Sequence, residues 1–130
     1  MKTLVKATVL GAALVWAGSA CAAGDAANGE KIFKSVCKMC HQIGAGAKAG
    51  IGPAQNGVYG STAGSRAGFN YSTPLKDAGA KGLVWNDDNL DKWLTSPKAL
   101  VPGTKMTFPG EKDAQKRADV IAFLKTQPAQ

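Results

Sequence analysis

The chain has 130 residues, 45% of them hydrophobic, and its 16 lysines and arginines against nine aspartates and glutamates give a formal net charge of +7. A chain of this length fits one domain, and no internal repeat or low-complexity tract divides it. A basic balance also suits a nucleic-acid binder, but no cluster of basic residues alternates with aromatic residues that would stack on bases. The composition therefore predicts one small basic domain with an acidic protein as partner.

The first 23 residues have the pattern of an export signal. Two early lysines precede an uncharged apolar run, residues 7–17, which is too short to span a bilayer, and small residues follow. Cleavage after Ala22 or Ala23 predicts a mature domain of residues 24–130 in the periplasm, where a protein rarely meets nucleic acid. Lipidation of Cys21 is the alternative, and it would tether the chain to a membrane as a subunit of a larger assembly.

Four segments have the residue spacing and end signals of helices. They are 26–36 after an Asp25 cap, 74–78 with a stop at Gly79, a run that starts at Asn86 and ends at Pro97, and a last helix from 112 or 113 to 126. Six glycines and a proline between positions 44 and 60 predict a shaped loop. No segment alternates apolar and polar residues for long enough to predict a sheet, so we expect an all-α fold of several short helices and long loops.

Cys37-Lys38-Met39-Cys40-His41 is a C-x-x-C-H sequence, the signature of covalent haem attachment. Two thiols separated by two residues add to the haem vinyl groups, and the histidine that follows is held beneath the iron as its proximal ligand. A zinc site, a dithiol enzyme and a structural disulfide are the competing interpretations. Structural zinc needs four Cys or His ligands, whereas the mature chain offers three, and a thioredoxin-like dithiol follows a strand that no pattern here predicts.

Iron held by His41 needs a sixth ligand or an open site. The chain has no second histidine, and Met39 lies inside the attachment loop and cannot reach the opposite haem face. Met106 ends the turn-forming stretch Pro102-Gly103-Thr104-Lys105-Met106, which suits a presented thioether better than core filler. His41 and Met106 as metal ligands favour electron exchange over substrate binding, so we expect no enzyme activity. Gas or peroxide chemistry is the alternative if Met106 is not a ligand.

These features together resemble the class I c-type cytochromes, close to mitochondrial cytochrome c and especially to the bacterial cytochrome c2 group. The resemblance covers nearly all of residues 24–130. It rests on Gly29, Phe33, Cys37-x-x-Cys40-His41, Gly52-Pro53, Gly68-Phe69-x-Tyr71, Trp85, Pro102-Gly103-Thr104-Lys105-Met106 and Ile121-Ala122-Phe123-Leu124. It implies the cytochrome c fold wrapped around one covalent haem c, and an electron carrier that cycles between Fe(II) and Fe(III) in respiratory or photosynthetic electron transport.

The resemblance also implies roles for particular residues at the haem. Pro53 presents its carbonyl to the free ring nitrogen of His41, which fixes the imidazole and strengthens it as a ligand. Tyr71, Ser72 and Trp85 stand at positions that hydrogen-bond the inner haem propionate in similar proteins.

Other positions bear on packing and on departures from the family pattern. Gly29 and Phe33 are implied to let the first helix pack across the last, against Val120 and Phe123. Thr104 and Trp93 are implied to line the methionine side of the haem. Ser61 stands where the family often has an arginine near a propionate, and the segment from Tyr71 to Trp85 is three residues longer than in mitochondrial members.

Lysines at the predicted haem edge indicate how the protein would meet its partners. They are Lys34, Lys38, Lys48, Lys98, Lys105 and Lys112. Such a ring steers encounters with acidic docking faces, here those of a cytochrome bc1-type donor and of an oxidase, reaction centre or dehydrogenase. Val36 stands where mitochondrial members have a docking lysine, so the ring is incomplete. We expect the mature protein to be soluble and monomeric.

Overall fold

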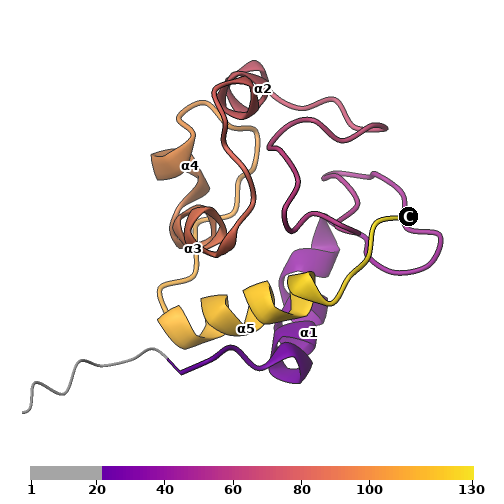
Figure 1. Ribbon diagram of the computed structural model, residues 1–130, viewed down its shortest axis with the longest axis vertical. Coiled ribbons are helices and arrows are strands. Elements are labelled where there is room, and N and C mark those ends of the chain that lie inside the picture. The colour runs from indigo at the N-terminus through magenta and orange to yellow at the C-terminus, as the bar shows by residue number, and fades with distance from the viewer. Residues whose placement is uncertain (1–21) are drawn as a thin grey trace, which may run out of the picture.

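The structure is a computed structural model, and it describes residues 22–130; the predicted export signal and Cys21 lie outside that range, apart from positions 22 and 23. Within it the chain folds into helices joined by long loops (Figure 1), which confirms the all-α prediction. The elements are α1 (Ala26–Ser35), a 3-10 turn η1 (Cys37–Met39), α2 (Thr73–Ala80), α3 (Asp87–Thr95), α4 (Pro97–Leu100) and α5 (Ala114–Lys125). None of these helices is long and apolar enough to cross a membrane.

Helices α1 and α5 cross and pack together at one side of the molecule (Figure 1). The crossing depends on Gly29, because a Cβ atom there would lie 1.9 Å from the backbone oxygen of Asp119. Next to it the rings of Phe33 and Phe123 are 5.5 Å apart. The predicted packing of Gly29 and Phe33 against the last helix is therefore present, and its closest contact is the α5 backbone.

The buried carboxylate of Asp119 in α5 forms hydrogen bonds with the start of α1. The Asp119 side chain is 3% exposed and accepts hydrogen bonds from the Asp25 amide at 2.8 Å, from Asn28 Nδ2 at 2.6 Å and from Gln115 Nε2 at 3.0 Å. These bonds hold the pKa of Asp119 below its usual range, because each donor favours the charged form. Asp25 in turn caps α1 as predicted, accepting from the amides of Ala27 and Asn28.

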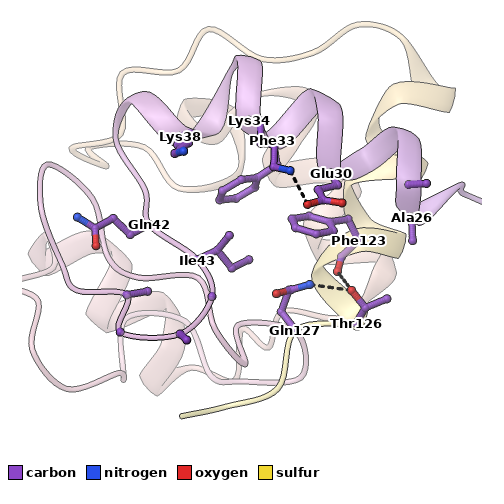
Figure 2. A pocket seen from close by; sticks show the side chains of 15 residues that line it. Ala26, Glu30, Phe33, Lys34, Lys38, Gln42, Ile43, Phe123, Thr126 and Gln127 are labelled. Atoms are coloured by element: carbon purple, nitrogen blue, oxygen red, sulfur yellow. Dashed lines mark hydrogen bonds and ion pairs between the residues drawn. The ribbon is translucent and has the colours of Figure 1, made fainter.

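A groove of about 710 Å³ runs between α1, the loop that follows the attachment turn and the end of α5. Figure 2 shows Phe33, Ile43 and Phe123 along it, with Lys34, Lys38 and Gln127 among the polar side chains at its edges. None of the residues predicted to bind haem lines this groove. It adjoins the attachment motif through Lys38 and Gln42.

The predicted stop at Gly79 is wrong, because α2 continues through this residue to Ala80. Gly79 is buried, and a Cβ atom there would lie 1.9 Å from the backbone oxygen of Ala63. The glycine therefore serves close packing of the helix against a neighbouring loop. Ser72 caps the helix, accepting from the Leu75 amide, and Pro74 occupies its first turn as predicted.

Pro97 was expected only to end the third helix, but it also begins a new one. Helix α3 starts after the Asn86 cap and ends at Thr95. Ser96 then accepts a hydrogen bond from the Ala99 amide and caps α4, a single turn with Pro97 buried at its first position. The chain thus bends between two short helices. The last helix, α5, starts after an Asp113 cap, within the predicted range.

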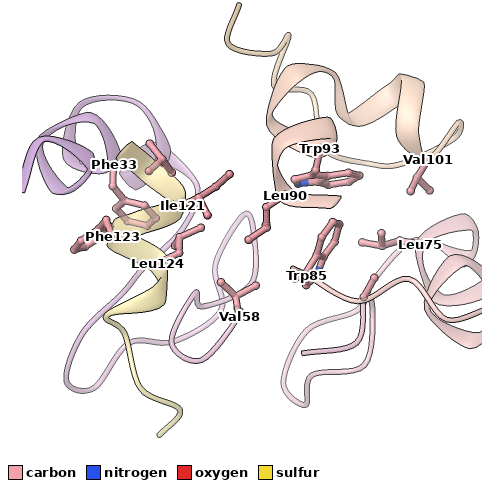
Figure 3. Close-up of a cluster of buried hydrophobic side chains, with 12 residues drawn as sticks. Phe33, Val58, Leu75, Trp85, Leu90, Trp93, Val101, Ile121, Phe123 and Leu124 are labelled. Carbon is pink, nitrogen blue, oxygen red and sulfur yellow. The ribbon is translucent and has the colours of Figure 1, made fainter. Parts of the chain in front are cut away.

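The buried apolar side chains form one cluster, in which two groups can be distinguished (Figure 3). One lies between α1 and α5 and includes Phe33, Ile121, Phe123 and Leu124; the other surrounds Trp85 and Trp93, whose rings are 5.1 Å apart. A short backbone ladder supports the second group, with an isolated antiparallel bridge between Thr62 and Val84. Arg117, only 11% exposed, ties α5 to α3 through its 2.7 Å ion pair with Asp91.

Candidate functional site

The end of α1 turns sharply into the C-x-x-C-H motif. The amides of Cys40 and His41 both donate to the Cys37 carbonyl, at 3.1 and 3.0 Å, which closes the turn around the two cysteines. Both thiols are free; Cys40 is exposed and Cys37 is half-buried against the core. Burial, and then the charge of Cys40, raises the pKa of Cys37 to about 11. Two unpaired thiols on one turn are the donors that thioether formation requires.

The imidazole of His41 is held in one orientation by the glycine-rich loop. Its Nδ1 lies 2.8 Å from the carbonyl oxygen of Pro53, the contact implied by the resemblance. Because a carbonyl only accepts, Nδ1 carries the proton and Nε2 keeps its lone pair for a metal. Burial lowers the pKa of His41, with the Pro53 contact opposing it, and the lowered value favours the neutral ring that a metal ligand needs.

Gly52 allows this loop to approach the imidazole. Its amide donates to the Cys40 carbonyl at 2.9 Å, and a Cβ atom at this position would lie 2.4 Å from His41 Cε1. Gly52 is buried, so the loop backbone itself forms the wall beside the ring. The Gly52-Pro53 pair therefore combines space for the ring with an acceptor for its N–H.

Gln55 is a site residue that the sequence pattern does not reveal. Its side-chain nitrogen lies 3.2 Å from the Pro53 carbonyl and 2.9 Å from His41 Nδ1. Because Nδ1 is the donor toward Pro53, the Gln55 amide donates to the same carbonyl. The Gln55 backbone is fixed by a 2.9 Å bond from its amide to Gln42, next to the motif. Only its position two residues after Pro53 hinted at this role.

Met106 lies on a structured turn after α4. The Thr104 amide donates to the Val101 carbonyl at 3.1 Å, and the Met106 amide donates to Thr104 Oγ1 at 3.3 Å. Gly103 has a φ of +87°, and a side chain there would meet Pro74 of α2. Met106 is half-buried and packs against the core cluster that also contacts Cys37. The turn is thus fixed on the N-terminal side of the methionine.

The three residues expected near a propionate occupy different environments. Ser72 is 6% exposed and caps α2, and Trp85 is 7% exposed within the core. Tyr71 is half-buried, with its ring 5.0 Å from that of Phe69. Burial raises the pKa of Tyr71.

Ser61 stands where the family often has an arginine, and Arg66 is an arginine close to the same region. The Ser61 hydroxyl donates to the Val58 carbonyl at 2.6 Å, so it is already used within its own loop. Arg66 donates to the Ala54 carbonyl at 3.0 Å, and its positive charge acts on Tyr71, lowering the pKa that burial raises. Arg66 therefore brings a guanidinium to the Tyr71 region that Ser61 cannot supply, and the sequence pattern did not identify it.

The donor set fits a haem group better than the competing interpretations. Within residues 22–130, no three His, Cys, Asp or Glu side chains gather as a metal site, so the ligands that structural zinc needs are not assembled. Cys37 and Cys40 are unpaired rather than bridged. Two free thiols, an imidazole with Nε2 available and a half-buried thioether are the groups that a covalently attached haem uses.

Comparisons with known proteins agree with this donor set. The sequence model of the cytochrome c family matches residues 26–128. Cytochrome c2 of Rhodomicrobium vannielii is 59% identical over 126 residues, covering 97% of this chain and 98% of that protein. Cytochrome c-554 of Methylosinus trichosporium is 46% identical over 85% of this chain and 80% of that protein.

Solved structures give the same result for the fold. Cytochrome c2 from Rhodospirillum centenum superposes with a TM-score of 0.76 at 39% identity, covering 81% of this chain and 99% of that one. Cytochrome cH from Methylobacterium extorquens gives a TM-score of 0.72 at 48% identity, covering 80% and 100%. Haem c, attached through Cys37 and Cys40, is the cofactor, and the general role is electron transfer. The chain belongs to the cytochrome c family.

Proposed function

We propose that the chain is a periplasmic single-haem electron carrier in which His41 and Met106 would be the protein ligands of the iron. The observation that carries the proposal is the state of His41. Its Nδ1 proton is engaged by Pro53 at 2.8 Å, so the neutral ring presents Nε2, one residue after the second attachment cysteine. Met106 supports it, since it is the remaining methionine in the mature chain outside the attachment loop.

The haem supplies one-electron chemistry when bound, and the protein sets the conditions for it. The Pro53 carbonyl orients the imidazole and increases its basicity, and Gln55 restrains that carbonyl. Thr104 holds the Met106 backbone in its turn. His41 and Met106 would together hold the iron and leave no open position for a substrate, which favours electron exchange over an enzyme activity.

The location and partners form a second part of the proposal. The first 23 residues have the composition of an export signal, and its removal leaves 14 basic and nine acidic residues in a soluble, monomeric domain. The lysines of the predicted ring are all exposed. Acidic faces of a bc1-type donor and of an oxidase, reaction centre or dehydrogenase are therefore suitable partners. Mass spectrometry of the mature N-terminus distinguishes cleavage after Ala22 or Ala23 from lipidation at Cys21.

Carbon monoxide binding tests the axial ligation. The chain is produced in an export-competent host with haem attachment machinery, reduced, and exposed to the gas while its visible spectrum is recorded. We expect no change for the wild type and rapid binding by Met106→Ala, because the substitution opens the sixth position. Equal binding by both proteins would overturn the proposal and favour gas or peroxide chemistry.

A further inference from the structure

The last four residues of the chain, 127–130, run back from the end of α5 to the loop that carries Pro53. Figure 1 shows this yellow segment leaving α5, and we call it the C-terminal tail. Helix α5 itself ends at Lys125, and the tail is not helical. Apart from bonds at the end of α5, the hydrogen bonds of the tail within the described chain go to the Pro53 loop.

Two hydrogen bonds join the C-terminal tail to the two ends of this glycine-rich loop. The Gly57 amide donates to the Gln127 carbonyl at 3.0 Å, and the side-chain amide of Gln130 donates to the Gly44 carbonyl. Asn56, which is 4% exposed, connects these ends, because its side chain accepts from the Gly44 amide and donates to the Gly44 carbonyl, both at 3.1 Å. The tail and both ends of the loop therefore form one hydrogen-bonded unit.

Gly57 also touches the tail directly. Its φ is +61°, and a Cβ atom there would lie 2.7 Å from both Cα and Cβ of Ala129. Gly46, in the same loop, has a similar φ of +71°, but a Cβ atom there would meet nothing within 4 Å. Both positions favour glycine because of their backbone conformation, whereas only Gly57 also needs it to make room for the tail.

The unit lies close in sequence to the carbonyl that orients His41. Pro53, whose carbonyl accepts from His41 Nδ1 at 2.8 Å, precedes Gly57 by four residues. Hydrogen bonds of Gln55 and Arg66 fasten the middle of this segment. The C-terminal tail fastens its end at Gly57, so the tail limits how far the segment can move away from the imidazole.

We propose that the C-terminal tail is a strap that holds the Pro53 loop against the end of α5 and thereby positions the imidazole of His41. The proposal rests on the function proposed above, in which His41 would be a ligand of the iron. A carbonyl held in place keeps its hydrogen bond to Nδ1, and that bond strengthens the imidazole as a ligand. A loosened tail lets the loop open locally, which weakens the bond and raises the reduction potential.

The experiment compares the haem-loaded wild type with a variant that ends at Thr126. NMR of the ferrous protein follows exchange of the His41 Nδ1 proton with solvent, and a redox titration gives the potential. The variant loses both hydrogen bonds to the loop, so exchange of this proton should be faster by about tenfold, and the potential should rise. Backbone amides of α1 should keep the wild-type rate, which separates local opening of the loop from a loss of overall stability.

Two alanine variants of the full chain provide a matched pair that does not depend on the truncated protein folding. Gly57→Ala strains the backbone and displaces the tail, whereas Gly46→Ala strains the backbone alone. Gly57→Ala should therefore raise the potential and speed exchange at His41, and Gly46→Ala should leave both at the wild-type value.

Wild-type exchange at His41 and a wild-type potential in the truncated protein would overturn the inference, even if the free energy of unfolding falls. Equal potentials for Gly57→Ala and Gly46→Ala would overturn it as well. Failure of the electron-carrier proposal is recognised separately, because the wild type itself would then not cycle between ferrous and ferric states.

Discussion

Replacement of Gly52 by alanine tests whether the loop backbone sets the position of His41. The new Cβ atom would lie 2.4 Å from Cε1, 2.6 Å from Nδ1 and 3.0 Å from Nε2 of the imidazole. Carbon atoms in contact prefer a separation of about 3.5 Å or more, so the ring or the loop must move by roughly 1 Å. That movement takes Nδ1, now 2.8 Å from the Pro53 oxygen, beyond hydrogen-bond distance.

The expected loss of stability in Gly52→Ala has two parts. Overpacking costs about 1–3 kcal/mol, and loss of the hydrogen bond costs about 1 kcal/mol, so Gly52→Ala should lower the free energy of unfolding by about 2–4 kcal/mol. The reduction potential should rise, because an imidazole without its carbonyl partner is a weaker donor to ferric iron. Guanidinium unfolding followed by tryptophan fluorescence, and a redox titration, measure the two quantities on the haem-loaded protein.

Gly50 provides a matched control two residues away. A Cβ atom there would meet nothing within 4 Å, and its φ lies outside the left-handed region. Gly50→Ala should therefore leave the potential unchanged and alter the free energy of unfolding by less than about 1 kcal/mol. Equal stability and equal potential for the two variants would refute the claim that close approach of Gly52 positions the imidazole.

Three further predictions concern the frame around the site. Gly29→Ala should destabilise the protein by about 2–3 kcal/mol in guanidinium unfolding, because its Cβ would lie 1.9 Å from the Asp119 oxygen; wild-type stability would contradict the close crossing of α1 and α5. Asp119 has a lowered pKa in the folded protein, so its contribution is present above its unfolded pKa of about 3.9 and is lost as pH falls through the folded value. Asp119→Asn should accordingly be less stable than wild type by about 1–3 kcal/mol at pH 7. The unfolding midpoints of the two proteins should converge once the pH falls below the folded pKa of Asp119, and a difference that persists at low pH would contradict this. Arg117→Met should lower the free energy of unfolding by about 2 kcal/mol, because it removes the ion pair with Asp91 and two hydrogen bonds from Nη1 to backbone carbonyls. Arg117→Lys should recover part of this loss in the same assay. No recovery would indicate that the loss comes from packing rather than from charge.

Helix starts could be predicted from the sequence, whereas some of the later boundaries could not. Asp25, Ser72, Asn86 and Asp113 each accept hydrogen bonds from the first turn of the helix that follows, a local effect visible in the residue type alone. Gly79 has the residue type of a helix stop, but its actual role is close packing against the Ala63 backbone, which is distant in the sequence. Pro97 fits either the end of one helix or the first turn of another, and here Ser96 caps the second.

The same distinction applies to the site. The attachment motif is contiguous, so its chemistry follows from spacing, and the Pro53 contact followed from the resemblance. Gln55 and Arg66 could not be identified from the sequence, because their partners are backbone carbonyls that the folded loop brings close. Every residue has such a carbonyl, so the residue type does not indicate which one accepts.

The most direct test of the central claim is the near-infrared absorption of the ferric protein, recorded for wild type, Met106→Ala and Met39→Ala. Met39 is the control because it is exposed and lies inside the attachment turn. Ligation by Met106 predicts a low-spin c-type spectrum with a methionine-to-iron charge-transfer band in the wild type and in Met39→Ala, and loss of that band in Met106→Ala. A high-spin wild-type spectrum that Met106→Ala leaves unchanged would contradict His/Met ligation and, with it, the electron-carrier account.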